Sequence, residues 1–197
     1  MDFDPPFIPS LVTGFNFEMN FQRVWAMPTS DTFDCEPING FVQKYLLKSK
    51  CSVDPFARNK RWATYTNDLN PGTTADHHME ASDFVDMLFN RGVYSDLVLF
   101  DPPYSPRQIS ECYESFGRKA TATDTQNGAL YSRVKKSIRD ICNPGAIVLS
   151  FGWNSSGMGK WWELLEILLV CHGGAHNDTI CMAERLLPNP QTTLFHQ

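Results

Sequence analysis

The sequence lacks several features that would assign the chain to a class at once. No apolar run approaches the roughly 20 residues of a membrane-spanning helix, and the first residues contain no basic segment followed by an apolar one. Internal repeats and low-complexity blocks are absent as well. We therefore expect a folded cytoplasmic protein without a membrane partner.

Paired metal-ligand spacings are also missing. The six cysteines include no C-x-x-C pair, so reduced cytosolic thiols are the simplest interpretation. His77 and His78 are adjacent, and neighbouring residues on a helix do not face the same way. The sequence therefore predicts no metal site, and we interpret these two as surface or cap histidines.

An excess of basic residues is lacking too. The 22 acidic residues outnumber the 17 lysines and arginines, giving a net charge of −5. This balance argues mildly against avid nucleic-acid binding, because phosphate contacts supply much of that affinity.

The length and composition of the chain indicate one folded domain. With 197 residues, 42% of them apolar and 20% charged, the chain is large enough for one continuous core. We expect a single domain over residues 1–197, with an extended arm over 1–22 and an extended tail over 188–197. No stretch remains for a separate target-recognition domain, so specificity is expected to be short, relaxed, or supplied by a second protomer or partner subunit.

The most informative stretch is DLVLFDPPY, residues 96–104. Its apolar run predicts a buried strand of a mostly parallel sheet, and Pro102 and Pro103 end that strand because they cannot continue a hydrogen-bonded ladder. Asp101 then stands at the carboxyl end of the strand, where α/β sheets bind ligands. The Asp101 carboxylate, the Pro102 carbonyl and the Tyr104 ring suit a planar heterocycle that carries an amino group.

The tetrapeptide Asp101-Pro102-Pro103-Tyr104 resembles the catalytic motif of S-adenosylmethionine (SAM)-dependent amino-methyltransferases, in particular the adenine-specific DNA methyltransferases of phages and prophages. The resemblance implies a Rossmann-like α/β fold, SAM as cofactor, DNA as partner, and a base flipped against Tyr104. It also implies a prokaryotic or phage-infected host cell. A second copy, Asp4-Pro5-Pro6-Phe7, has no apolar strand before it and is interpreted as part of the extended arm.

The resemblance extends to a cofactor loop upstream. Asp54, Pro55 and Phe56 match the start of the family's D-P-F-x-G-x-G loop, but Ala57 and Arg58 replace its glycines. Glycine permits close approach to a ligand and positive φ, so this departure indicates an altered loop. We expect Asn59 to supply part of that freedom.

Two further acids complete the expected cofactor site. Asp68 follows a second candidate strand and would accept the ribose hydroxyls, with a solvated turn as the alternative. Resemblance to the family's third stretch implies that Asp83 and Phe84 hold the adenine end of SAM. The W-A-M-P segment, which begins at Trp25, resembles one that covers the methionine end of SAM, although core packing explains Trp25 equally well.

Most candidate contacts to nucleic acid follow the catalytic turn. A basic face would include Arg107, Arg118, Lys119, Lys135 and Lys136, with Trp153 lining the base pocket or wedging into a duplex. A solvated helix face explains residues 133–139 equally well, and a simple turn explains Trp153.

The remaining pattern fits the same fold class. Residues 146–150 predict a buried strand, residues 160–165 a helix, and residues 167–171 and 179–183 a terminal antiparallel hairpin whose turn exposes His172 and His176. Three functions stay open on the sequence: a DNA adenine N6 methyltransferase, an amino-methyltransferase of ribosomal or transfer RNA acting on guanine N2 or adenine, and a non-catalytic nucleic-acid-binding or partner subunit.

Overall fold

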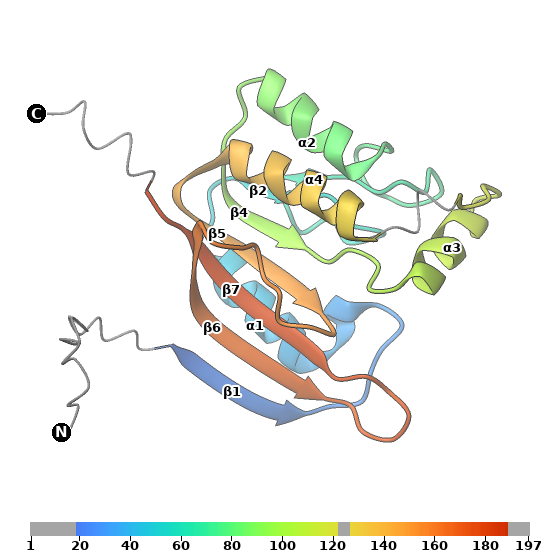
Figure 1. The fold of residues 1–197 in the computed structure, drawn as a ribbon, viewed down its shortest axis with the longest axis vertical. Helices are drawn as coiled ribbons and strands as arrows, with labels where there is room; N and C mark the ends of the chain where they lie inside the picture. Colours follow the sequence, from blue (N-terminus) through green and yellow to red (C-terminus); the bar gives the residue numbers. More distant parts are fainter. Residues whose placement is uncertain (1–18, 122–126, 189–197) are drawn as a thin grey trace, which may run out of the picture.

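The computed structural model describes residues 19–121 and 127–188, and within that range it forms one seven-stranded sheet (Figure 1). The strand order is β1-β6-β7-β5-β4-β2-β3. Only β7 runs antiparallel to its neighbours, β5 and β6. The predicted mostly parallel sheet with a terminal hairpin is therefore confirmed. The Asp4–Phe7 copy of the motif and nearly all of the arm and tail lie outside the described residues.

The sheet is built from strands of very different length. Their bounds are β1 Asn20–Trp25, β2 Ser52–Asp54, β3 Tyr65–Thr66, β4 Ser95–Phe100, β5 Cys142–Gly152, β6 Trp162–Cys171 and β7 Thr179–Leu186. The helices are η1 Thr32–Asp34, α1 Glu36–Leu46, α2 Ala81–Asn90, α3 Pro106–Glu114 and α4 Asn127–Ile141. No helix in the described ranges is long and apolar enough to cross a membrane.

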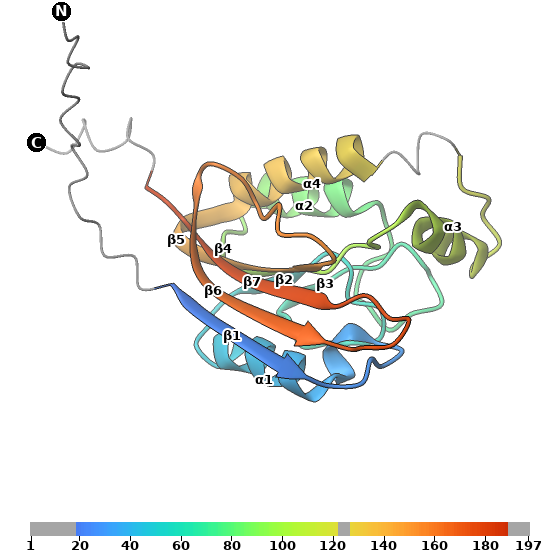
Figure 2. The same cartoon turned by 60° about the horizontal axis from the view of Figure 1, so that its bottom comes forward.

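Helices cover both faces of the sheet, as Figure 2 shows: α1 lies on one face, and α2 and α4 lie on the other. This covering explains the unbroken apolar run of residues 97–100 in β4. Leu97 and Leu99 pack in the core beneath α1, whereas Val98 and Phe100 pack in the core beneath α2 and α4. Because both faces are covered, alternation of polar and apolar residues is lost.

Two sequence predictions about the carboxyl-terminal third are wrong. The stretch predicted as a helix over 160–165 belongs largely to β6, because short apolar runs do not distinguish a helix from a buried strand. His172 is not exposed in its turn: it is 4% exposed, and its ring lies 2.7 Å from the Ala26 carbonyl oxygen and 2.9 Å from Thr179 Oγ1. It ties the hairpin to the chain leaving β1.

The amino-terminal prediction also changes. Residues 20–22, assigned to the extended arm, begin β1, which pairs in parallel with β6 at the edge of the sheet. Strand β1 was not predicted, because five of its six residues are exposed and it carries no apolar run. Between β4 and β5 the chain forms α3 and α4, of which α3 was not predicted.

One crossover is unusual for a parallel sheet. Strands β2 and β3 pair in parallel, yet residues 55–64, which connect them, contain no helix. Parallel neighbours are normally joined by a crossover helix. The connection therefore folds as a loop held by side chains at the carboxyl edge of the sheet.

Candidate active site

A cavity of about 550 Å³ opens at the carboxyl ends of β2, β3 and β4. Its walls come from the loops that leave these strands and from α3. This is the edge where the predicted catalytic turn was expected to meet the predicted cofactor loop. The sequence-predicted residues that line the cavity are Pro55, Phe56, Asn59, Asp68, Asp101, Pro102, Pro103 and Tyr104.

Asp101 is the central acid of the catalytic turn. Burial raises the pKa of Asp101 to about 6, although hydrogen bonds from Tyr104 and Thr32 act in the opposite direction. The carboxylate is thus ionised at neutral pH but close to its protonated form. Among the described residues, no hydrogen bond engages the Pro102 carbonyl oxygen, which leaves it free to accept one.

The turn is held from three sides. The Tyr104 hydroxyl donates to the Asp101 carboxylate, and the Tyr104 backbone N–H lies 2.5 Å from Gln108 Oε1. The Tyr131 hydroxyl, from α4, donates to the Pro103 carbonyl. The Trp153 ring meets the Tyr104 ring edge-on, with centroids 5.5 Å apart. Tyr104 therefore lies folded over Asp101 beside a second aromatic ring.

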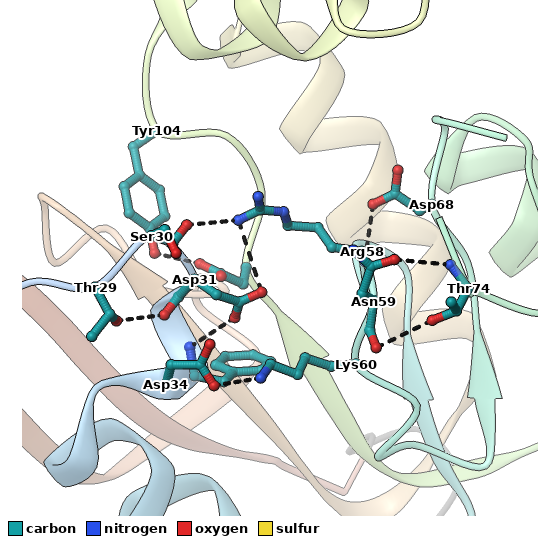
Figure 3. Close-up of polar contacts among 12 residues, drawn as sticks. Thr29, Ser30, Asp31, Asp34, Arg58, Asn59, Lys60, Asp68, Thr74 and Tyr104 are labelled. Atoms are coloured by element: carbon teal, nitrogen blue, oxygen red, sulfur yellow. Dashed lines mark hydrogen bonds and ion pairs between the residues drawn. The ribbon is translucent and has the colours of Figure 1, made fainter. Parts of the chain in front are cut away.

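The loop after β2 contains a residue in the left-handed backbone conformation that is not a glycine. Arg58 has φ of 49°, and no other non-glycine residue in the described ranges has positive φ. The freedom expected of Asn59 is therefore at Arg58 instead. Arg58 N–H donates to Asp68 Oδ2 (3.0 Å) and its Nη1 donates to the Ser30 carbonyl (3.0 Å), so the side chain extends toward residues 30–31 (Figure 3).

Asp68 shapes the loops that form the cavity. Its Oδ2 accepts from Arg58 N–H, and its Oδ1 accepts from Asn70 N–H at 2.8 Å. Burial raises its pKa, while these two backbone N–H groups lower it. Asp68 lines the cavity, but two of its acceptor positions already serve the protein backbone.

Asp54 is not brought into the cavity. It is 1% exposed beneath the loop. Its Oδ1 accepts from Phe56 N–H (3.0 Å), while no described atom bonds to its Oδ2. Burial raises its pKa well above the usual range. The acid that opens the predicted cofactor motif is thus a buried support for the turn.

Three other predicted cofactor residues lie away from the cavity. Trp25 ends the edge strand β1, is 66% exposed, and lies against Gly173. Asp83 points outward from α2 and pairs with Arg133 at 2.8 Å, whereas Phe84 points into the core. Because α2 begins at Ala81, the acid that reaches the cavity is Glu80, just before the helix.

Sequence reasoning missed several lining residues, among them Thr32, Arg58, Glu80 and Gln108. Thr32 begins η1 and hydrogen-bonds to Asp101, a contact between distant parts of the chain that no local sequence signal predicts. A usable signal existed for Gln108, because Ser105 and Pro106 mark a helix start that would aim its first turn at the catalytic turn.

The cavity carries a clear charge asymmetry. Its described lining includes the acids Asp68, Glu80, Asp101 and Glu111 and one cation, Arg58. Glu80 and Glu111 are paired with Arg118 and Arg107, so the asymmetry rests mainly on Asp68 and Asp101. A cavity lined in this way favours a ligand with positive charge close to the acids.

The expected nucleic-acid contacts separate in space. Arg107 pairs with Glu111 (2.7 Å), and Arg118 pairs with Glu80 (3.1 Å) beside the Tyr113 ring. Lys119 is exposed, and Trp153 is 41% exposed next to Tyr104. Lys135 and Lys136 line a separate groove on α4. Within residues 19–121 and 127–188, no three His, Cys, Asp or Glu side chains gather as a metal site.

Comparison with known proteins identifies the fold. No protein-family model matches the chain, and no curated protein is detectably similar to it. The crystal structure of SMU.776, a putative methyltransferase complexed with SAH, matches with a TM-score of 0.52 and 11% identity over 74% of this chain and 48% of that chain. The putative methyltransferase yhhF from Escherichia coli matches with a TM-score of 0.50 and 11% identity over 82% of this chain and 92% of that chain. Our chain thus spans about half of the first protein and most of the second, and it has the class I methyltransferase fold.

Proposed function

We propose that this chain transfers a methyl group from SAM to the exocyclic amino nitrogen of a nucleobase, with adenine N6 in DNA as the leading substrate. One observation carries the proposal. The Asp101–Tyr104 turn stands at the carboxyl end of β4 and forms one wall of the acidic cavity. A carboxylate, a free carbonyl and an aromatic ring therefore meet at the edge where this fold class binds its ligands.

The cavity fits SAM by volume and by charge. About 550 Å³ lies within the range of small-molecule sites. SAM carries a net positive charge from its sulfonium and ammonium groups, which the acidic lining favours. Glu80 and Asp68 would face the cationic and ribose portions, and Arg58 would lie near its carboxylate. When bound, SAM supplies the electrophilic methyl group.

The catalytic turn would act by accepting hydrogen bonds. Asp101 and the Pro102 carbonyl would each accept one from the amino group, which favours a tetrahedral nitrogen with an available lone pair. Because the pKa of Asp101 is about 6, the carboxylate is ionised at neutral pH and matches the positive charge that develops on nitrogen. Positioning of the two reactants would supply much of the remaining acceleration.

The substrate follows from resemblance and from the aromatic pair. The ring centroids of Tyr104 and Trp153 lie 5.5 Å apart at the turn. Both rings are suited to contact a base that has been flipped out of its helix. The motif's likeness to adenine-specific DNA methyltransferases favours DNA. An RNA amino-methyltransferase is the competing assignment.

Transfer of labelled methyl from SAM to duplex DNA, single-stranded DNA and bulk RNA, followed by nucleoside mass spectrometry, tests the proposal. We expect N6-methyladenine in DNA. Asp101→Asn should lose at least about a hundredfold in turnover while retaining SAM binding. Asp4→Asn alters the other D-P-P-aromatic copy and serves as the matched control, with turnover unchanged. Label in RNA would reassign the substrate, and an active Asp101→Asn enzyme would refute the mechanism.

A further inference from the structure

A second groove, of about 440 Å³, lies between α4 and the connection from β5 to β6. Three cations line it on α4: Lys135, Lys136 and Arg139. Trp161 lies across from them, and Lys160 is its exposed neighbour.

The charge of this groove is opposite to that of the main cavity. No acidic residue is among the residues that line it. The chain as a whole has a net charge of −5, so the positive charge of this groove differs in sign from the average of the protein. A groove of this sign favours a polyanion.

Three cations at the groove differ from several arginines near the candidate site, because no acidic side chain among the described residues pairs with them. Arg107, Arg118 and Arg133 are each paired with an acidic side chain. Among the described residues, no acid pairs with Lys136, Arg139 or Lys160. Their charges therefore remain available to a ligand.

Trp161 indicates which part of a nucleic acid would bind. The Arg139 guanidinium and the Lys160 ammonium both lie 4.8 Å from the Trp161 ring centre. These cation–π contacts occupy the ring and hold both charges beside it. Because the aromatic surface is already in use, the groove offers charge rather than a platform for base stacking.

Lys135 plays a different part from its neighbours. Its Nζ donates to the Gly157 carbonyl, and it lies 5.9 Å from the Phe100 ring centre. Burial lowers its pKa, with the nearby Glu184 acting in the opposite direction. Lys135 therefore holds the 152–161 connection against α4, and contact with an anion falls to Lys136, Arg139 and Lys160.

The groove and the candidate active site share a wall. Tyr131 lines the groove, and its hydroxyl donates to the carbonyl of Pro103, which lines the main cavity. A strand lying in the groove would thus pass directly behind the catalytic turn. That arrangement suits a substrate whose backbone is held while one base enters the cavity.

We propose that the groove lined by Lys136, Arg139 and Trp161, together with Lys160 beside Trp161, binds the sugar–phosphate backbone of the nucleic-acid strand whose base is presented to Asp101. The inference rests on the proposed function for its substrate class, but its binding can be measured without methyl transfer.

The test is the salt dependence of binding to fluorescein-labelled single-stranded DNA, measured by fluorescence anisotropy. The triple variant Lys136→Gln, Arg139→Gln, Lys160→Gln should weaken binding at least about tenfold. It should lower the slope of log Kd against log salt by roughly 2, since each cation contributes about 0.7 on a single strand. The matched control is Lys48→Gln, Lys50→Gln, Arg91→Gln, which removes three exposed cations elsewhere and should bind like the wild type.

The outcomes separate the two proposals. Loss of binding in the groove variant, with no methyl transfer by the wild type, would support the groove and reject the proposed function. Methyl transfer by the wild type, with an unchanged slope in the groove variant, would overturn the groove alone. Equal weakening in both triple variants would also overturn it, because attraction would then be diffuse. Binding of a mononucleotide as tight as that of the oligonucleotide would overturn the assignment to a strand.

Discussion

The phenol of Tyr104 donates a hydrogen bond to the carboxylate of Asp101, three positions earlier in the same turn. This contact opposes the effect of burial on the pKa of Asp101 and favours its ionised form. It also places the Tyr104 ring beside Trp153. The aromatic residue expected only to stack on a base thus also favours the ionised form of Asp101.

Replacing Tyr104 by Phe should shift the acidic limb of the pH profile of kcat/KM to higher pH. Loss of a donor to the ionised carboxylate raises the pKa of Asp101, and a hydrogen bond of this kind is worth about one pH unit. We expect kcat/KM to fall several-fold at pH 6 and to stay near wild type at pH 8, because an aromatic ring remains. The pH profile of kcat/KM measures this shift. Tyr131→Phe, which loses a bond to Pro103 instead, is the control and should leave the limb in place.

Asp101→Asn should inactivate the protein and stabilise it. The pKa of Asp101 rises from 3.8 to about 6 on folding, so the folded state binds more protons between these values. The free energy of unfolding therefore falls as pH rises through that window, and the penalty is fully present above pH 6. Removing the charge should add on the order of 1 kcal/mol at pH 7.

Urea unfolding at two pH values checks that prediction. The gain in the free energy of unfolding should be present at pH 7 and much smaller at pH 4, where the wild-type carboxyl is protonated in the folded state and only about half ionised in the unfolded state. An Asn variant less stable than wild type at pH 7 would contradict it.

Arg58→Gly and Arg58→Ala separate backbone strain from side-chain contacts. Both lose the bond to the Ser30 carbonyl and the approach to Asp31, but only glycine adopts φ of 49° without a Cβ penalty. We expect the Gly variant to be about 1 kcal/mol more stable than the Ala variant. Thermal unfolding of the two variants measures the difference, and equal stability would show that Arg58 is unstrained.

Asp68→Ala should loosen both loops that Asp68 joins. The change leaves the backbone N–H groups of Arg58 and Asn70 without their acceptor, which costs about 1–3 kcal/mol where the groups stay buried. The affinity for SAM, measured by calorimetry, should fall together with the free energy of unfolding. Asp68→Asn retains one acceptor oxygen and should lose less of both quantities. Full SAM affinity in the Ala variant would remove Asp68 from the cofactor site.

Much of the sheet could be predicted because the local sequence of its central strands indicates that they are buried on both faces. Residues 97–100 are apolar at consecutive positions because both sheet faces are covered, and the prolines that follow mark where the ladder stops. Strand β1 could not be predicted, since an exposed edge strand has neither an apolar run nor a regular alternation. The start of β6 was mistaken for a helix because its pairing with β7, with a register shift between Leu164 and Glu166, is a long-range property.

The candidate site divides in the same way. Asp101, Pro102 and Tyr104 were predictable, since the end of a buried strand places them at the ligand-binding edge of an α/β sheet. Asp54 and Asp83 were misplaced because a motif gives the order of residues but not the direction of each side chain. Glu80 reaches the cavity because α2 begins one residue later.

The sequence by itself determined the catalytic turn, since a buried apolar run followed by two prolines has few local solutions. Only the tertiary structure decided which charges act together. Folding gathers Asp68 and Asp101 from two strand ends, Glu80 from before α2 and Glu111 from α3 around one cavity. Among the described residues it leaves cations without an acidic partner on the opposite side of the Tyr131–Pro103 contact. The physical reason is range: backbone dihedral preferences act between neighbours in the chain, whereas electrostatic fields depend on distances that only packing sets.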